Sequence, residues 1–150
     1  MLKKSDLTPC QLDAMLGKIC PYCKSGTKVM TQQEIYGQTF SKETVVACKN
    51  YPYCKAYVGT HSDGRPLGRL AKQDLRLLKK DCKEPFNRLW QIGRMTRSEC
   101  YEQLSKHLDL DPELTHFGMF GKETCIKARN WAIQKLIEFD RVEGKLPNGV

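Results

Sequence analysis

Residues 20–23 read Cys-Pro-Tyr-Cys, and residues 48–54 read Cys-Lys-Asn-Tyr-Pro-Tyr-Cys. These stretches supply two closely spaced cysteine pairs, with 24 residues between them: Cys20, Cys23, Cys48 and Cys54. Four thiolates complete a tetrahedral zinc site, and because no coordination position stays open, such a site is structural rather than catalytic. The sequence therefore predicts one structural Zn²⁺ ion. Iron and a disulfide are the alternatives, and a redox Cys-x-x-Cys would leave Cys48 and Cys54 without a role.

The segment around the cysteines carries the signals of short β-strands. Val, Thr and Tyr are concentrated at 27–31, 44–48 and 56–60, and these residue types favour strands. Residues 18–62 are too few to bury a sufficient apolar core, so a bound metal is expected to supply folding free energy. We predict a zinc ribbon over 18–62, with a small antiparallel sheet of three or four strands.

Helical signals flank the predicted ribbon. Thr8-Pro9 has the form of an N-cap followed by proline at the first helical position, and Gly17 is suited to end that helix. After a linker at 61–67, apolar residues at helical spacing predict a first helix that ends at about 83, where Pro85 breaks it. Three further helices are predicted over 86–93, 96–107 and 122–141. The fold class is α+β: the four-cysteine ribbon, then a three- to four-helix C-terminal part. The predicted division is 1–17 (short helix), 18–62 (zinc ribbon), 63–143 (helical domain) and 144–150 (tail).

The charge of the chain is basic and unevenly distributed. The formal net charge is +8 over 150 residues, with a pI near 9.1. Between Arg65 and Arg97, ten Lys/Arg oppose three Asp/Glu, a net +7, whereas from Ser98 onward seven oppose nine, a net −2. A basic segment of this kind is typical of a surface that faces a polyanion. A solvated face of an ordinary globular protein is the alternative.

Aromatic residues are dense in the predicted ribbon. Bases stack on such rings for about 1–3 kcal/mol each, and neighbouring lysines can meet phosphates. About half of the rings are expected to pack into the core, and Tyr22, Tyr36 and Tyr53 are expected to be exposed. The candidate nucleic-acid-binding residues are Tyr22, Lys24, Lys28, Tyr36, Lys49, Tyr53 and Lys55 in the ribbon, and Arg65, Arg69, Lys72, Arg76, Lys79, Lys80 and Lys83 after it.

Two resemblances follow from these motifs. The run CPYC … VVACKNYPYCKAYVG resembles the four-cysteine zinc ribbons of type IA DNA topoisomerases, which implies contact with single-stranded DNA. The topoisomerase's catalytic body is lacking, so no strand-passing activity is implied. Over most of the chain, the ribbon with Pro66-Leu67-Gly68, Leu89-Trp90, Arg97-Ser98-Glu99 and His116–Phe120 resembles a family of phage and bacterial proteins that contain a zinc-finger domain. This second resemblance implies the ribbon, a helical C-terminal part and a phage or mobile-element origin.

The four cysteines outside the ribbon share no ligand spacing. Free buried cysteines pack as small hydrophobes, and two of these four fall on apolar helical faces. A second metal site that adds His107 or His116 is the alternative. The four cysteines are Cys10, Cys82, Cys100 and Cys125.

Residues 1–18 contain no apolar run of signal-sequence length, and no stretch approaches the ~18 apolar residues of a membrane span. We expect a cytoplasmic protein (host cytoplasm if phage-encoded) with no membrane partner.

His61 and Asp63 share a loop, but a metal-dependent nuclease needs clustered carboxylates, so we expect no enzyme. The expected function is a zinc- and nucleic-acid-binding accessory protein, with DNA favoured over RNA. The alternative is an adaptor that docks on an acidic protein surface and inhibits or redirects a host enzyme.

Overall fold

The computed structural model describes residues 1–142, so the predicted tail at 144–150 and the last residue of the predicted helical domain lie outside the described residues. A small antiparallel sheet, a cysteine cluster and several C-terminal helices confirm the α+β class. The helices and strands are α1 (Pro9–Met15), β1 (Thr27–Met30), α2 (Gln32–Tyr36), β2 (Val45–Cys48), β3 (Tyr57–Gly59), α3 (Gln73–Gln91), α4 (Arg97–Leu108) and α5 (Lys122–Val142), with 3-10 turns η1 (Lys4–Asp6), η2 (Pro112–Leu114) and η3 (Phe117–Met119).

The chain divides into two compact units, and the division falls inside α3. The ribbon unit is Lys4–Arg76, and the helical unit is Met1–Lys3 together with Leu77 onward. The four-part division drawn from the sequence stays a prediction.

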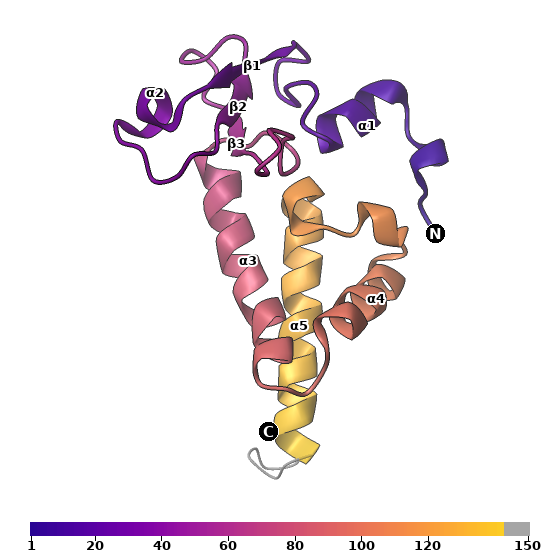
Figure 1. The fold of residues 1–150 in the computed structure, drawn as a ribbon. Helices are drawn as coiled ribbons and strands as arrows, with labels where there is room; N and C mark the ends of the chain where they lie inside the picture. Colours follow the sequence, from indigo (N-terminus) through magenta and orange to yellow (C-terminus); the bar gives the residue numbers. More distant parts are fainter. Residues whose placement is uncertain (143–150) are drawn as a thin grey trace. The chain divides into compact units, whose positions relative to one another are not determined.

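The ribbon unit is built on a three-stranded antiparallel sheet in the order β1-β2-β3 (Figure 1). Val46 of the central strand pairs with Val29 of β1 and Val58 of β3. All four residues of β2 are buried, as expected for a continuous apolar run in a central strand. Three cysteines are among the six buried members of one core cluster of this unit: Cys20, Val46, Cys48, Cys54, Ala56 and Leu70. The cysteine site is therefore part of the core itself.

Two short helices of the ribbon unit begin with reciprocal caps. The Thr8 hydroxyl accepts the Gln11 N–H at 3.1 Å, and the Gln11 side chain accepts the Thr8 N–H at 2.9 Å. The predicted start of α1 is thus confirmed. Helix α2 was not predicted, although Thr31 and Glu34 form the same reciprocal cap, which satisfies two backbone N–H groups that a helix start leaves free.

The helical unit is held by an aromatic core. The Phe86 ring of α3 lies 4.8 Å from the Tyr101 ring, 5.2 Å from Phe117 and 6.4 Å from Trp131, measured between ring centroids. These rings come from α3, α4, η3 and α5, so one side chain joins four segments. Among residues 1–142, no helix has both the length and the apolar character needed to cross a membrane.

The prediction that Pro85 breaks the helix is wrong, since α3 runs through it from Gln73 to Gln91. Proline has no N–H, so the Asp81 carbonyl loses its helical donor. Pro85 and Phe86 are both buried. Packing of this turn into the core therefore offsets the lost hydrogen bond, and tertiary packing decides the outcome over local propensity.

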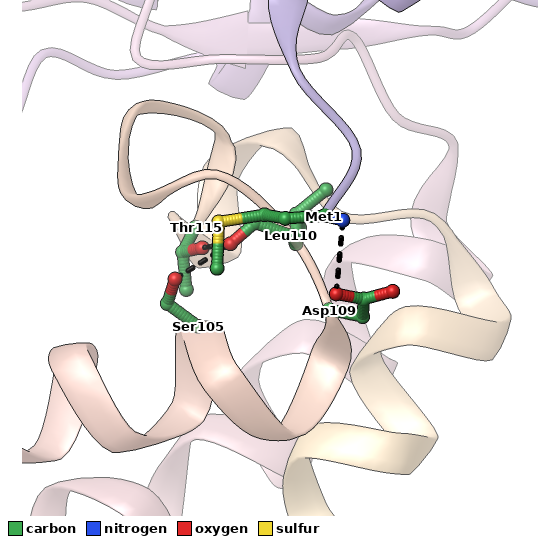
Figure 2. Close-up of polar contacts among 5 residues, drawn as sticks. All are labelled: Met1, Ser105, Asp109, Leu110 and Thr115. Atoms are coloured by element: carbon green, nitrogen blue, oxygen red, sulfur yellow. Dashed lines mark hydrogen bonds and ion pairs between the residues drawn. The ribbon is translucent and has the colours of Figure 1, made fainter.

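The segment after α4, predicted as a loop at 109–121, contains the turns η2 and η3. Buried hydroxyls hold its start: Ser105 Oγ donates to the Leu110 carbonyl at 2.6 Å, and Thr115 Oγ1 lies 3.5 Å from the same oxygen (Figure 2). The amino group of Met1 lies 3.1 Å from the Asp109 carboxylate in the same view. Side-chain hydroxyls thus add to backbone hydrogen bonds in this part of the helical unit, such as the one that the Asp111 N–H donates to the Leu2 carbonyl at 2.8 Å.

Candidate metal centre and nucleic-acid interface

The four predicted ligands meet in the ribbon unit. The Sγ atoms of Cys20, Cys23, Cys48 and Cys54 all lie within 4.8 Å of one another, and Cys20 Sγ is 3.7 Å from Cys54 Sγ. A tetrahedral site with Zn–S bonds of about 2.3 Å has sulfur–sulfur edges of about 3.8 Å, which fits this separation. A disulfide needs about 2.05 Å, and all four cysteines are free. The arrangement is that of one structural zinc ion.

A tight turn forms the first pair of ligands. The Cys20 N–H donates to the Ser25 carbonyl and the Lys24 N–H donates to the Cys20 carbonyl, both at 2.8 Å. Lys24 has a φ of +59°, whereas Gly26 is not among the residues with positive φ. The left-handed residue of this turn is therefore a lysine and not the nearby glycine, Gly26.

The second pair is spaced by a five-residue loop that folds into two consecutive turns. The Tyr51 N–H donates to the Cys48 carbonyl at 2.9 Å, and the N–H groups of Tyr53 and Cys54 both donate to the Asn50 carbonyl, at 2.9 and 3.2 Å. The Cys48 N–H also donates to the Ala56 carbonyl at 3.0 Å. Cys48 is fixed by β2 and its flanking turns, and Cys54 returns to the same point.

Cys48 and Cys20 differ in the pKa of their thiols because their surroundings differ. Burial opposes ionisation of Cys48, but the Ser25 hydroxyl, 3.5 Å away, and the Asn50 N–H, 3.4 Å away, lower its pKa to about 7. Burial raises the pKa of Cys20 to about 12. Zinc binds thiolates and releases their protons, so the ion would supply the charge that keeps buried Cys20 ionised.

The three tyrosines predicted to be exposed are exposed, but they are not equivalent. Tyr53 is 96% exposed, against 44% for Tyr22 and 43% for Tyr36. The Tyr22 hydroxyl accepts the Lys72 N–H at 3.2 Å, and Lys72 Nζ lies 4.8 Å from the centre of the Tyr22 ring. The Tyr36 ring packs edge-on against Tyr57 at 5.9 Å. Tyr53 is therefore the most accessible of the three for stacking.

The candidate cations are divided between the two units, and several of them are engaged by other groups of the protein. Lys28 Nζ donates to the Tyr51 carbonyl at 2.9 Å, and Arg65 Nε lies 2.6 Å from the Asp63 carboxylate. Lys24, Lys49 and Lys55 are exposed in the ribbon unit, where Arg69 is half-buried. Lys79, Lys80 and Lys83 belong to the helical unit, and Lys79 Nζ donates to the Gly118 carbonyl at 2.9 Å.

One groove of about 400 Å³ gathers part of the candidate set within the ribbon unit. We call it the basic groove. The Arg76 guanidinium lies 3.7 Å from the centre of the Tyr57 ring and also donates to the Ala71 carbonyl. Tyr51 and Tyr57 were not in our candidate set, although both alternate with lysines in the sequence. The lining of the basic groove includes three cations, one acid and two aromatic rings: Lys55, Lys72, Arg76, Asp74, Tyr51 and Tyr57.

Comparison with known proteins agrees with the metal centre. A family model described as a zinc-finger-containing domain matches residues 17–135, which is most of the chain. The match begins before Cys20 and ends inside α5, so it takes in all four ligands and parts of both units. No curated protein and no solved structure matches the chain.

Proposed function

The chain belongs to the family of zinc-finger-containing domains, and from this premise we propose that it is a nucleic-acid-binding accessory protein that prefers single-stranded DNA. The basic groove carries the proposal, because three cations and two aromatic rings line it together. A flexible polyanion with stackable bases is the ligand that such a mixture favours. The structural zinc ion supplies no reaction and holds the loops that present these side chains.

The cations of the groove are suited to the phosphate backbone. Lys55 and Lys72 are exposed. Arg76 is held over the Tyr57 ring, which fixes the plane of a guanidinium that can donate to two phosphate oxygens. Asp74 is the one acid of the lining, and its Oδ1 accepts the Leu75 N–H at 2.9 Å. That carboxylate is therefore engaged with the start of α3.

The second zinc loop adds a stacking position beside the groove. Tyr53 is 96% exposed, and Lys49 and Lys55 on either side of it are also exposed. Residues 18–62 hold six lysines against two glutamates, a net charge of +4. A base stacked on Tyr53 would bring its flanking phosphates towards these lysines, which is the pattern of sequence-tolerant single-strand binding.

DNA is preferred to RNA in this proposal because the ribbon resembles those of type IA DNA topoisomerases. We further propose a phage or mobile-element origin, a cytoplasmic location and a role without catalysis. The absence of catalysis rests on the closed ligand set, since four thiolates leave no position for a substrate on the metal.

The test is a titration of a fluorescent single-stranded oligonucleotide with the zinc-loaded protein. We expect binding at ~50 mM salt that weakens steeply as salt rises. Tyr53→Ala should weaken it about 5- to 150-fold, the equivalent of one lost stack of 1–3 kcal/mol, whereas Tyr53→Phe keeps the ring. Lys55→Gln should weaken binding more than Lys42→Gln, which removes an exposed lysine outside the groove. No binding of DNA or RNA at ~50 mM salt would overturn the proposal.

A protein partner is the second candidate, and exposed apolar side chains of the ribbon unit favour it. Val29 and Phe40 are each 68% exposed, and such side chains near basic residues suit docking on an acidic protein surface. Capture of an acidic partner from nuclease-treated lysate, lost in Phe40→Ser and kept in Tyr53→Ala, would support the adaptor. Capture that disappears with nuclease treatment would instead support nucleic-acid binding.

A further inference from the structure

A second cavity, of about 380 Å³, lies wholly within the helical unit. Its volume falls in the range of small-molecule sites, about 300–1,000 Å³. Side chains from the first turns of α4 form one side, and the segment from η2 to η3 forms the other. Its lining includes Arg97, Ser98, Tyr101, Glu102, Pro112 and His116. The proposed binding of nucleic acid by the ribbon unit uses none of them.

The cavity presents a positive charge that is not neutralised by the protein. The Arg97 guanidinium lies 4.9 Å from the centre of the Tyr101 ring, and within residues 1–142 it forms no ion pair. Glu102 is the one acid of the lining, but its carboxylate lies 3.4 Å from Lys106 Nζ, one turn further along α4. The groups that face the cavity therefore favour a negatively charged ligand.

His116 adds a second basic group opposite α4. Its ring lies 6.1 Å from the Tyr101 ring, and its side chain makes no capping hydrogen bond to η3, the turn that it precedes. Burial and the charge of Arg97 hold its pKa below the ordinary value. An anion bound between Arg97 and His116 would reverse the effect of that charge, because a nearby negative charge favours the protonated imidazole.

We propose that this cavity binds a phosphomonoester, with its phosphate between Arg97 and His116 and its organic part against Pro112 and the Tyr101 ring. The guanidinium fork, the Ser98 hydroxyl and the imidazole offer donors to the three terminal oxygens of a phosphate. A carboxylate has only two oxygens and would leave a donor unmatched. The apolar lining gives the attached group a surface, so the ester should bind more tightly than free phosphate.

Imidazole NMR of the wild-type protein tests the proposal directly, because the chain has three histidines and His116→Asn assigns the relevant signals. Inorganic phosphate and phenyl phosphate should both shift the His116 signals and raise its pKa, with phenyl phosphate binding more tightly. Phenol should shift the His116 signals no more than added buffer does. The His61 signals should not shift with any of these ligands. Absence of a His116 response to both phosphates, or an equal response to phenol, would overturn the proposal. Binding of inorganic phosphate alone would overturn the ester assignment.

Variants separate the site from a general charge effect. Arg97→Gln should weaken phenyl phosphate about tenfold, as expected for one charge-assisted hydrogen bond. Arg94→Gln, which removes a nearby arginine outside the lining, should leave the affinity unchanged. Equal weakening by the two variants would overturn the site. If Arg97→Gln fails to fold, Ser98→Ala should still weaken binding severalfold with helix content intact.

The source of the phosphomonoester is distinguished by comparing two ligands. One is phenyl phosphate, and the other is a short oligonucleotide with or without a 5′-phosphate. A His116 response that requires the 5′-phosphate and exceeds that of phenyl phosphate assigns the site to a nucleic-acid end. Equal or weaker binding of the oligonucleotide assigns it to a small ester. Tyr53→Ala should leave the His116 response to phenyl phosphate unchanged, so failure of the proposed nucleic-acid function and failure of this site are separable.

Discussion

The ribbon unit and the helical unit obtain their folding free energy from different sources. Three of the six buried residues in the core cluster around the metal centre of the ribbon unit are zinc ligands, and no phenylalanine or tryptophan is buried among residues 4–76. In the helical unit, Phe86, Phe117, Phe120 and Trp131 are buried and pack ring against ring. A small unit with few apolar residues needs a metal, whereas large buried aromatic rings stabilise a unit without one. The two units should therefore respond to different perturbations.

Removal of zinc should have the largest effect and should act on the ribbon unit. Structural zinc contributes about 10–16 kcal/mol of apparent binding free energy, which is folding free energy in a unit of this kind. We expect a chelator, or Cys48→Ser, to abolish hydrogen-exchange protection in β1, β2 and β3. The fluorescence of Trp90 and Trp131, the only two tryptophans and both in the helical unit, should change little.

The matched control is Cys10→Ser, which alters an exposed cysteine outside the ligand set and should leave both units folded. Persistent protection of the three strands in protein shown to be zinc-free would refute the metal-built core.

Phe86→Ala should have the converse effect on the helical unit. The Phe86 side chain is fully buried and contacts Tyr101, Phe117 and Trp131. Truncation of such a core residue costs about 3–5 kcal/mol. Denaturant unfolding followed by tryptophan fluorescence should show this loss, while zinc content stays at one ion per chain. Ile92→Ala, at a side chain that is 50% exposed, is the control and should cost much less.

The sequence predicted the ribbon unit's scaffold better than its surface. Ligand spacing is a local property, so the four cysteines and three strands were predicted with small errors at the strand ends. The sequence does contain the capping signal of Thr31 and Glu34. Helix α2 was nevertheless missed, because so short a helix between strands gives no apolar periodicity. Pro85 was misread because local propensity does not show that its turn is buried.

The basic groove could not be predicted because its residues meet through non-local pairing. Tyr57 and Ala71 exchange two backbone hydrogen bonds, at 3.1 and 3.0 Å. This pairing brings the segment before α3 against β3 and places Arg76 over the Tyr57 ring. Charge counts along the chain treated Lys55 and Lys72 as members of separate segments. The same counts joined Lys72 to Lys79 and Lys83, which belong to the other unit.

Gly17→Ala should destabilise the ribbon unit by a smaller amount. Gly17 has a φ of +77°, and a Cβ at this position would lie 2.8 Å from Pro66 Cβ. A non-glycine residue in that conformation costs of order 1–3 kcal/mol, and the close contact adds to it. Gly26→Ala is the control, since its Cβ would meet nothing within 4 Å. Comparable losses for the two variants, measured as the chelator concentration that releases half of the zinc, would contradict this account.

The smallest effect we predict is a pH dependence confined to the helical unit. Burial and then the charge of Arg97 lower the pKa of His116 in the folded state from its ordinary 6.5. The unfolded chain therefore takes up a proton more readily, and stability falls as the pH drops through 6.5 towards the folded pKa. Denaturant midpoints from tryptophan fluorescence should decrease slightly between about pH 7.5 and about pH 5.5, and His116→Asn should flatten this slope. Arg97→Gln should flatten it partially, because burial still lowers the pKa. An unchanged slope in His116→Asn would assign the dependence to other groups.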